Sequence, residues 1–70
     1  MPKLLSSKTI IKTLETKGFI FVSQKGSHIK YRKHGNVVLT VIISANKKEI
    51  PYGTLRSILR QAKLTEEDFK

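Results

Sequence analysis

The sequence predicts a two-layer α+β domain, in which two helices cover one face of a three-stranded antiparallel sheet. Two segments with the apolar periodicity of helices lie near the ends of the chain, and three short strand-like runs stand between them. Short glycine-containing turns separate these runs, so consecutive strands are expected to pair as hairpins. A sheet with one apolar face needs both helices on that face, which gives two layers.

The first helix is expected to run from Ser6 or Ser7 to about Lys17. Serine is a favourable N-cap, because its hydroxyl accepts a hydrogen bond from a backbone N–H of the first turn. Gly18 follows at the position where helices commonly end in the left-handed conformation. The apolar side of this helix consists of Ile10, Ile11 and Leu14.

Three strands follow, each rich in β-branched or aromatic residues. Their expected ranges are 19–24, 28 to 33 or 34, and 37–43. The turn Lys25-Gly26-Ser27 joins the first two strands, and the three-residue loop His34-Gly35-Asn36 joins the last two.

The three-residue loop sets the expected pairing of the second and third strands. It places Leu39 opposite Tyr31 and Val41 opposite Ile29, so that the apolar side chains of both strands share one face. A one-residue slip would move the whole apolar set to the other face. The segment 44–50 is predicted to be a polar connection between the third strand and the second helix.

The second helix is expected to begin at Pro51 and to run to about Lys63. Its apolar residues have the i, i+3, i+4, i+7 spacing of one helix face: Leu55, Ile58, Leu59 and Ala62. Arg56 and Arg60 lie on its opposite side. Thr65 then precedes three acidic residues, which predicts a short terminal helix with Phe69 folding back.

The chain is strongly basic, with 14 Lys and Arg against 5 Asp and Glu and a formal net charge of +9. Residues 1–64 carry +11, because three of the five acids lie in the last six residues. Such a surface favours phosphate backbones or a strongly acidic protein partner. A membrane surface fits less well, because the cations are spread over several elements and not along one amphipathic helix.

Length and composition narrow the possibilities further. Seventy residues are expected to form a single domain over residues 1–70. No cysteine is present, which excludes thiolate metal sites and is compatible with a cytoplasmic location. No segment has the length and hydropathy of a membrane span or signal peptide. Glu15 and Glu49 lie on different elements, so no metal site is expected. P-loop and dinucleotide-binding motifs are also missing, so no cofactor is expected.

The chemically distinctive stretch is Gln24-Lys25-Gly26-Ser27-His28, in which a flexible corner leads into the second strand. Strand alternation places His28, Lys30 and Arg32 on one face and the apolar residues between them on the other. A histidine titrates near neutral pH, and two cations about 7 Å apart can hold a phosphodiester beside it. A small metal-free ribonuclease could be built in this way; the plainer alternative is a solvated basic strand face.

RNA scission by transesterification needs a base for the 2′-hydroxyl, an acid for the leaving 5′-oxygen and positive charge for the dianionic phosphorane. His28 can serve as base or acid. The candidate RNA-binding residues are Lys25, Gly26, Ser27, Lys30, Arg32, Arg56 and Arg60. His34 lies six residues beyond His28, on the order of 20 Å away along an extended strand, so one phosphate cannot contact both.

Three stretches carry a family likeness: Leu14-Glu15-x-x-Gly18-Phe19, Gln24-Lys25-Gly26-Ser27-His28, and Lys48-Glu49-Ile50-x-x-Gly53-Thr54-Leu55-Arg56-Ser57-Ile58-Leu59-Arg60-Gln61-Ala62. Together they resemble the HicA family of small mRNA interferase toxins from bacterial and archaeal toxin–antitoxin pairs. The resemblance spans about residues 7–69. The order of helix, three strands and helix is also similar to the double-stranded-RNA-binding fold, which by itself assigns no function.

The resemblance to HicA toxins implies metal-independent cleavage of mRNA, a single catalytic histidine at His28, and silencing by a HicB-type antitoxin. Two positions depart from the family pattern. Ile43-Ser44-Ala45 stands where many members have a second histidine after the third strand, and Lys63 stands where a glycine often ends the second helix.

Two other functions fit parts of the sequence. A non-catalytic RNA-binding module would use the same fold and charge, but it would not need an imidazole at the corner. A basic scaffold for an acidic protein fits the charge and leaves the corner unexplained. The expected partners are mRNA and a HicB-like antitoxin that is acidic where it covers His28.

Overall fold

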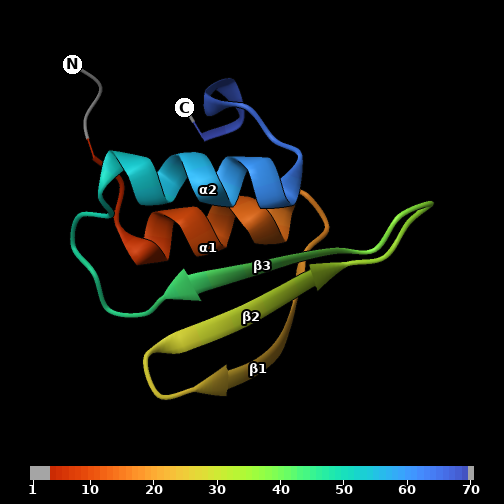
Figure 1. The fold of residues 1–70 in the computed structure, drawn as a ribbon, viewed down its shortest axis with the longest axis horizontal. Helices are drawn as coiled ribbons and strands as arrows, with labels where there is room; N and C mark the ends of the chain where they lie inside the picture. Colours follow the sequence, from red (N-terminus) through yellow and green to blue (C-terminus); the bar gives the residue numbers. More distant parts are fainter. Residues whose placement is uncertain (1–3, 70) are drawn as a thin grey trace.

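The computed structural model describes residues 4–69. Its elements, in chain order, are α1 (Ser7–Thr16), β1 (Ile20–Lys25), β2 (His28–Lys33), β3 (Leu39–Ser44), α2 (Tyr52–Ala62) and the 3-10 helix η1 (Glu66–Phe69). Both α-helices cover one side of an antiparallel sheet with the strand order β1-β2-β3 (Figure 1). The predicted two-layer α+β fold is confirmed.

The helix ends follow the local sequence. Ser6 is the N-cap of α1, and its hydroxyl accepts a hydrogen bond of 3.1 Å from the Thr9 N–H. Gly18, just after α1, has φ +96°. Helix α2 ends at Lys63, which has φ +59° and thus a left-handed conformation. A lysine in that conformation carries a steric cost that glycine avoids.

Strands β1 and β2 form a tight hairpin in which Lys25 pairs with His28. The turn is therefore Gly26-Ser27 alone, one residue shorter than predicted, because Lys25 extends the strand ladder. Gly26 has φ +60°, and a positive φ at the first loop position matches the type II′ turns whose twist suits a two-residue hairpin. The pairing also contains an irregularity between Phe21 and Ser23.

The predicted pairing of β2 and β3 was wrong by two residues. Tyr31 pairs with Val41 and Ile29 pairs with Ile43, so the loop between the strands spans residues 34–38. A shift of two preserves which side chains face the helices, so the alternation of apolar residues could not detect it. In the observed pairing both Val41 and Ile43 are fully buried beneath the helices.

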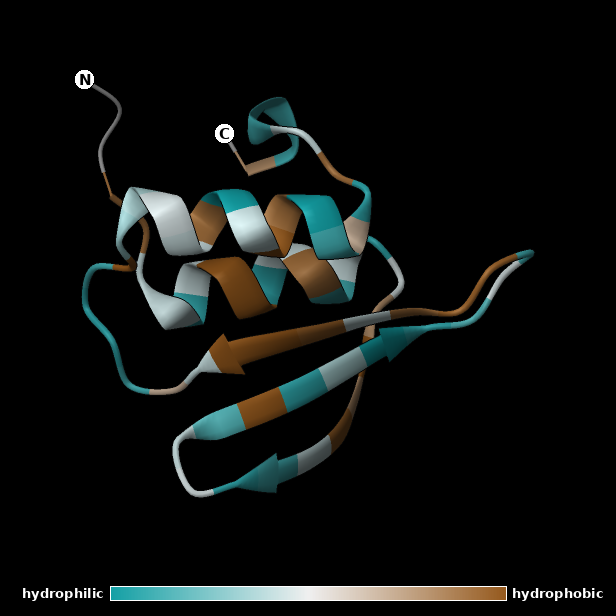
Figure 2. Ribbon diagram, viewed as in Figure 1, coloured by the Kyte–Doolittle hydropathy of each residue, from teal (hydrophilic) through white to brown (hydrophobic). Residues whose placement is uncertain are grey.

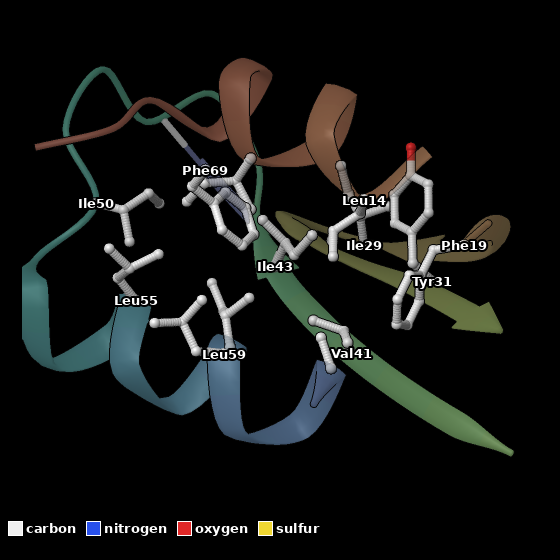
Figure 3. Close-up of a cluster of buried hydrophobic side chains, with 13 residues drawn as sticks. Leu14, Phe19, Ile29, Tyr31, Val41, Ile43, Ile50, Leu55, Leu59 and Phe69 are labelled. Atoms are coloured by element: carbon white, nitrogen blue, oxygen red, sulfur yellow. The ribbon is translucent and has the colours of Figure 1, made fainter. Parts of the chain in front are cut away.

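The hydrophobic core lies between the sheet and the two helices (Figure 3). Bands of alternating hydropathy along β2 mark the strand's two faces (Figure 2).

Ile50 belongs to this core with 1% exposure, although the segment 44–50 was predicted as a polar connection. Its N–H donates to the Leu5 carbonyl at 2.7 Å, which ties the connection to the residues before α1. Phe69 is also buried, as predicted for the terminal helix.

The helix layer is not centred on the sheet. Both helices pack chiefly against β3, while all six residues of β1 are exposed (Figure 1). Phe21 is 56% exposed and makes an edge-to-face contact with Tyr31, with ring centroids 6.1 Å apart. The edge strand β1 therefore lies beyond the cover of the helices, whereas Ile29 and Tyr31 of β2 are buried beneath them.

Candidate active site

The Gly26-Ser27 turn holds His28 at one end of the sheet. A β-carbon on Gly26 would meet nothing within 4 Å, so its positive φ, and not crowding, explains the glycine. The Gln24 side-chain amide donates to the Gly26 carbonyl at 3.0 Å. The Ala45 N–H donates to the Ser27 carbonyl at 2.6 Å, which ties the turn to the end of β3. The turn is thus held from both neighbouring strands.

His28 is exposed and lies on the central strand of the sheet. Its directly opposite neighbours are Lys25 on β1 and Ser44 on β3. Opposite residues of an antiparallel pair project to the same face, with Cβ atoms about 5 Å apart. The imidazole is therefore flanked by an ammonium group on one side and a hydroxyl on the other.

Lys30 and Arg32 continue the same face of β2 away from the helices. The apolar residues between them, Ile29 and Tyr31, are buried, which confirms the predicted division of the strand into two faces. The Arg32 Nε donates to the Thr40 hydroxyl at 3.1 Å across the β2–β3 pair. This hydrogen bond orients the guanidinium along the outer face of the sheet.

Five of the seven candidate RNA-binding residues lie around this face: Lys25, Gly26, Ser27, Lys30 and Arg32. Arg56 and Arg60 do not. They lie one turn apart on the exposed side of α2, where they line a shallow pocket with Gly53. They therefore form a second basic surface, away from the strand cations. His34 is exposed in the loop after β2, at the opposite end of the strand from His28.

Sequence reasoning missed the place of Ser44 beside His28. In the predicted pairing His28 would have faced Ile42, and the shift of two residues brings Ser44 there instead. Apart from strand register, no signal in the sequence marks this serine.

A second serine, Ser7, was expected only as a possible cap and has a different role. Ser7 is the one buried polar residue among residues 4–69, with 3% exposure. Its hydroxyl donates to the Ser44 carbonyl at 2.6 Å and accepts from the Lys47 N–H at 3.0 Å. Its own N–H donates to the Lys47 carbonyl at 2.9 Å. Ser7 thus joins the first turn of α1 to the end of β3 and to the loop that follows.

Within residues 4–69, no group of three or more His, Asp or Glu side chains is arranged to hold a metal ion. No helix in that range is long and apolar enough to span a membrane.

Comparison with known proteins identifies the family. The family model for the HicA toxin of bacterial toxin–antitoxin matches residues 7–64, which run from the first residue of α1 to just past the end of α2. No curated protein matches the chain. The matched range includes His28 and all seven candidate RNA-binding residues. The chain therefore belongs to the HicA family, whose members are the toxins of toxin–antitoxin systems.

Proposed function

We propose that this toxin is an endoribonuclease that cleaves mRNA without a metal ion and uses His28 as its general acid or base. The observation that supports the proposal most is the exposed His28 at the end of β2, opposite Lys25 on the same face. Lys30 follows about 7 Å further along that face. One phosphate beside the imidazole can therefore contact ammonium groups from two strands.

The reaction would be an in-line transesterification. The 2′-oxygen loses its proton, attacks the adjacent phosphorus and displaces the 5′-oxygen, which takes up a proton as it leaves. His28 performs one of these proton transfers. Lys25 and Lys30 stabilise the negative charge that builds up on the phosphorane, as does Arg32. Since no second histidine stands beside His28, the other proton transfer falls to a lysine or to a group of the substrate, and the enzyme is expected to be slow.

The antitoxin is expected to be of the HicB type and to act by occlusion. The face that carries His28 is basic, so a complementary partner is acidic where it covers the imidazole. Co-expression of the toxin with the protein encoded beside it tests this part of the proposal. A stable complex that no longer cleaves RNA is expected, and failure to form any complex would contradict it.

The decisive experiment compares cleavage of a labelled mRNA by wild type and His28→Ala in excess EDTA, with RNA binding measured for both. Loss of a general acid or base is expected to slow cleavage by about 10²–10⁴-fold and to leave binding largely intact. His34→Ala is the matched control, because it removes an exposed histidine outside the site. His28→Ala should melt within a few degrees of wild type, since the side chain is exposed.

The outcomes separate the main function from its alternative. Cleavage that persists in EDTA and disappears only in His28→Ala supports a histidine-dependent, metal-independent nuclease. Equal binding by both proteins with no cleavage by either would favour a non-catalytic RNA-binding protein. Loss of cleavage in EDTA alone would contradict the metal-independent mechanism.

A further inference from the structure

A groove with a volume of about 830 Å³ lies between α1 and the segment that follows β3. We call it the basic groove. Its rim carries four lysines: Lys8 and Lys12 from α1, and Lys47 and Lys48 from the loop after β3. Its floor includes the aliphatic side chains of Ile11, Ile29 and Ala45. The fold thus places two lysines of α1 along a concave surface.

Two elements line the groove. Helix α1 lies on one side of it, and the loop 45–48, which follows β3, lies on the other. Each element contributes two of the four lysines. An extended polyanion in the groove can therefore contact lysines of both elements.

The basic groove lies at the same end of the sheet as His28 but on the helix side. Ile29 lines it and is the next residue along β2, with its side chain on the opposite face from His28. Ala45, which also lines it, donates its N–H to the Ser27 carbonyl. The β1–β2 turn, the end of β3 and the start of α1 all lie at the same end of the molecule (Figure 1). Ser7 fixes their relative positions, because its hydroxyl binds both the Ser44 carbonyl and the Lys47 N–H.

Glu15 is the one acidic residue that lines the basic groove. It lies almost a full turn beyond Lys12, and its carboxylate accepts a hydrogen bond from the Tyr31 hydroxyl at 3.4 Å. Burial of the ring, and after it the nearby Glu15 carboxylate, raises the pKa of Tyr31, so this hydroxyl stays protonated and remains a donor. The charge of the groove is dominated by its lysines.

We propose that the basic groove binds the RNA backbone next to the scissile phosphate, so that the strand passes from the His28 corner around the end of the sheet and between the lysines. The proposal rests on RNA being the substrate of the proposed function. The groove's aliphatic floor offers no aromatic platform on which bases could stack. Its contacts are therefore with phosphate and sugar, and it adds affinity without adding sequence preference.

The test measures binding of a short, unstructured single-stranded RNA at several salt concentrations, in the His28→Ala background so that the RNA stays whole. Each lost lysine–phosphate contact should reduce the slope of log K against log salt by about 0.7, equivalent to about fivefold in affinity at 0.1 M salt. The Lys8→Gln/Lys12→Gln double variant should therefore lose about 1.4 in slope. The same loss is expected with a second RNA of unrelated sequence.

Matched single variants control for charge and folding. Lys12→Gln and Lys63→Gln remove the same charge from exposed lysines, but Lys63 lies at the end of α2, outside the basic groove. Lys12→Gln should lower the slope and Lys63→Gln should leave it nearly unchanged. The proposal would be overturned if Lys12→Gln, Lys63→Gln and the double variant all gave the same slope of log K against log salt. The thermal melting curves of these variants should agree closely with one another, since substitutions of exposed side chains change stability little.

The readouts distinguish this proposal from the proposed function. If RNA binding falls as expected and no variant ever cleaves RNA, the basic groove is an RNA site and the nuclease proposal fails. If His28-dependent cleavage and RNA binding both survive the loss of the lysines, the groove proposal fails and the nuclease stands. If the lysine variants bind RNA normally but escape inhibition by the antitoxin, the groove is a protein-docking surface and the proposal is overturned.

Discussion

Ser7 shows how much a single buried hydroxyl can organise in a small protein. Its hydroxyl and N–H make three hydrogen bonds, to Ser44 on β3 and to both backbone groups of Lys47. A backbone group left unpaired in a buried place costs more free energy than an average hydrogen bond contributes, because it has lost its water as well. The position of Ser44 beside His28 therefore depends on a residue that belongs to a helix.

We expect Ser7→Ala to lower the free energy of unfolding by about 1–3 kcal/mol, because it removes the partner of the Ser44 carbonyl and the Lys47 N–H. Urea unfolding monitored by circular dichroism measures the change. Ser57→Ala is the control, since the Ser57 hydroxyl bonds only to the Gly53 carbonyl within α2. Equal losses in the two variants would show that the Ser7 bridge adds nothing of its own.

Lys63 has a backbone conformation that is unfavourable for any residue with a side chain. Its φ of +59° lies in the left-handed region, where a β-carbon crowds the backbone.

We expect Lys63→Gly to raise the free energy of unfolding by on the order of 1 kcal/mol. Lys63→Ala keeps the β-carbon and should give no such gain, and thermal melts of the two variants make the comparison. A gain of equal size in both would point to the lost charge instead.

At the scale of elements, strand alternation predicts faces but not pairing. The side-chain period of a strand is two residues, so the buried positions Ile29 and Tyr31 could be identified from the sequence. A shift of β3 by two residues leaves these faces unchanged, so the pairing of Tyr31 with Val41 and of Ile29 with Ile43 could not be read from alternation. The helices were predicted more accurately, because caps and turn residues act within a few positions.

The terminal helix η1 is joined to α1 by an ion pair, with 3.2 Å between the Lys17 Nζ and Asp68 Oδ1. The backbone N–H of Thr65, and then Lys17, hold the pKa of Asp68 below its ordinary value of 3.8. Protons therefore bind more tightly to Asp68 in the unfolded chain than in the folded one. This carboxylate stabilises the fold above pH 3.8, and its contribution is lost as the pH falls through the lower pKa of the folded state.

We expect Asp68→Asn to remove the loss of folding stability that protonation of Asp68 causes at acidic pH. The stability of wild type should fall more steeply than that of the variant as the pH drops below about 4, because the variant has no carboxylate to protonate. Urea unfolding at a series of acidic pH values measures both slopes. Glu49→Gln, which alters an exposed acid in the loop before α2, serves as the control and should follow wild type. Parallel curves for wild type and Asp68→Asn would contradict the expectation.

At the scale of the whole molecule, charge and shape act together. Residues 1–64 carry a net charge of +11, which attracts polyanions over distances comparable to the Debye length, about 10 Å at 0.1 M salt. The fold distributes this charge into the strand face around His28, the basic groove, and the separate pair Arg56 and Arg60 on α2. The first surrounds His28 and the second lies at the same end of the molecule, whereas Arg56 and Arg60 line a separate pocket. The net charge alone therefore overstates how many cations can contact one substrate.

The sequence by itself determined the two-layer fold, the ends of the helices and the exposed face that carries His28. These features depend on short-range patterns: capping residues, a turn glycine and the two-residue period of a strand. The place of Ser44 opposite His28, the bridge made by Ser7 and the basic groove were decided only in the tertiary structure. Each depends on how far the strands slide and where the helix layer sits on the sheet. Packing of the shared core, and not any local pattern, determines both.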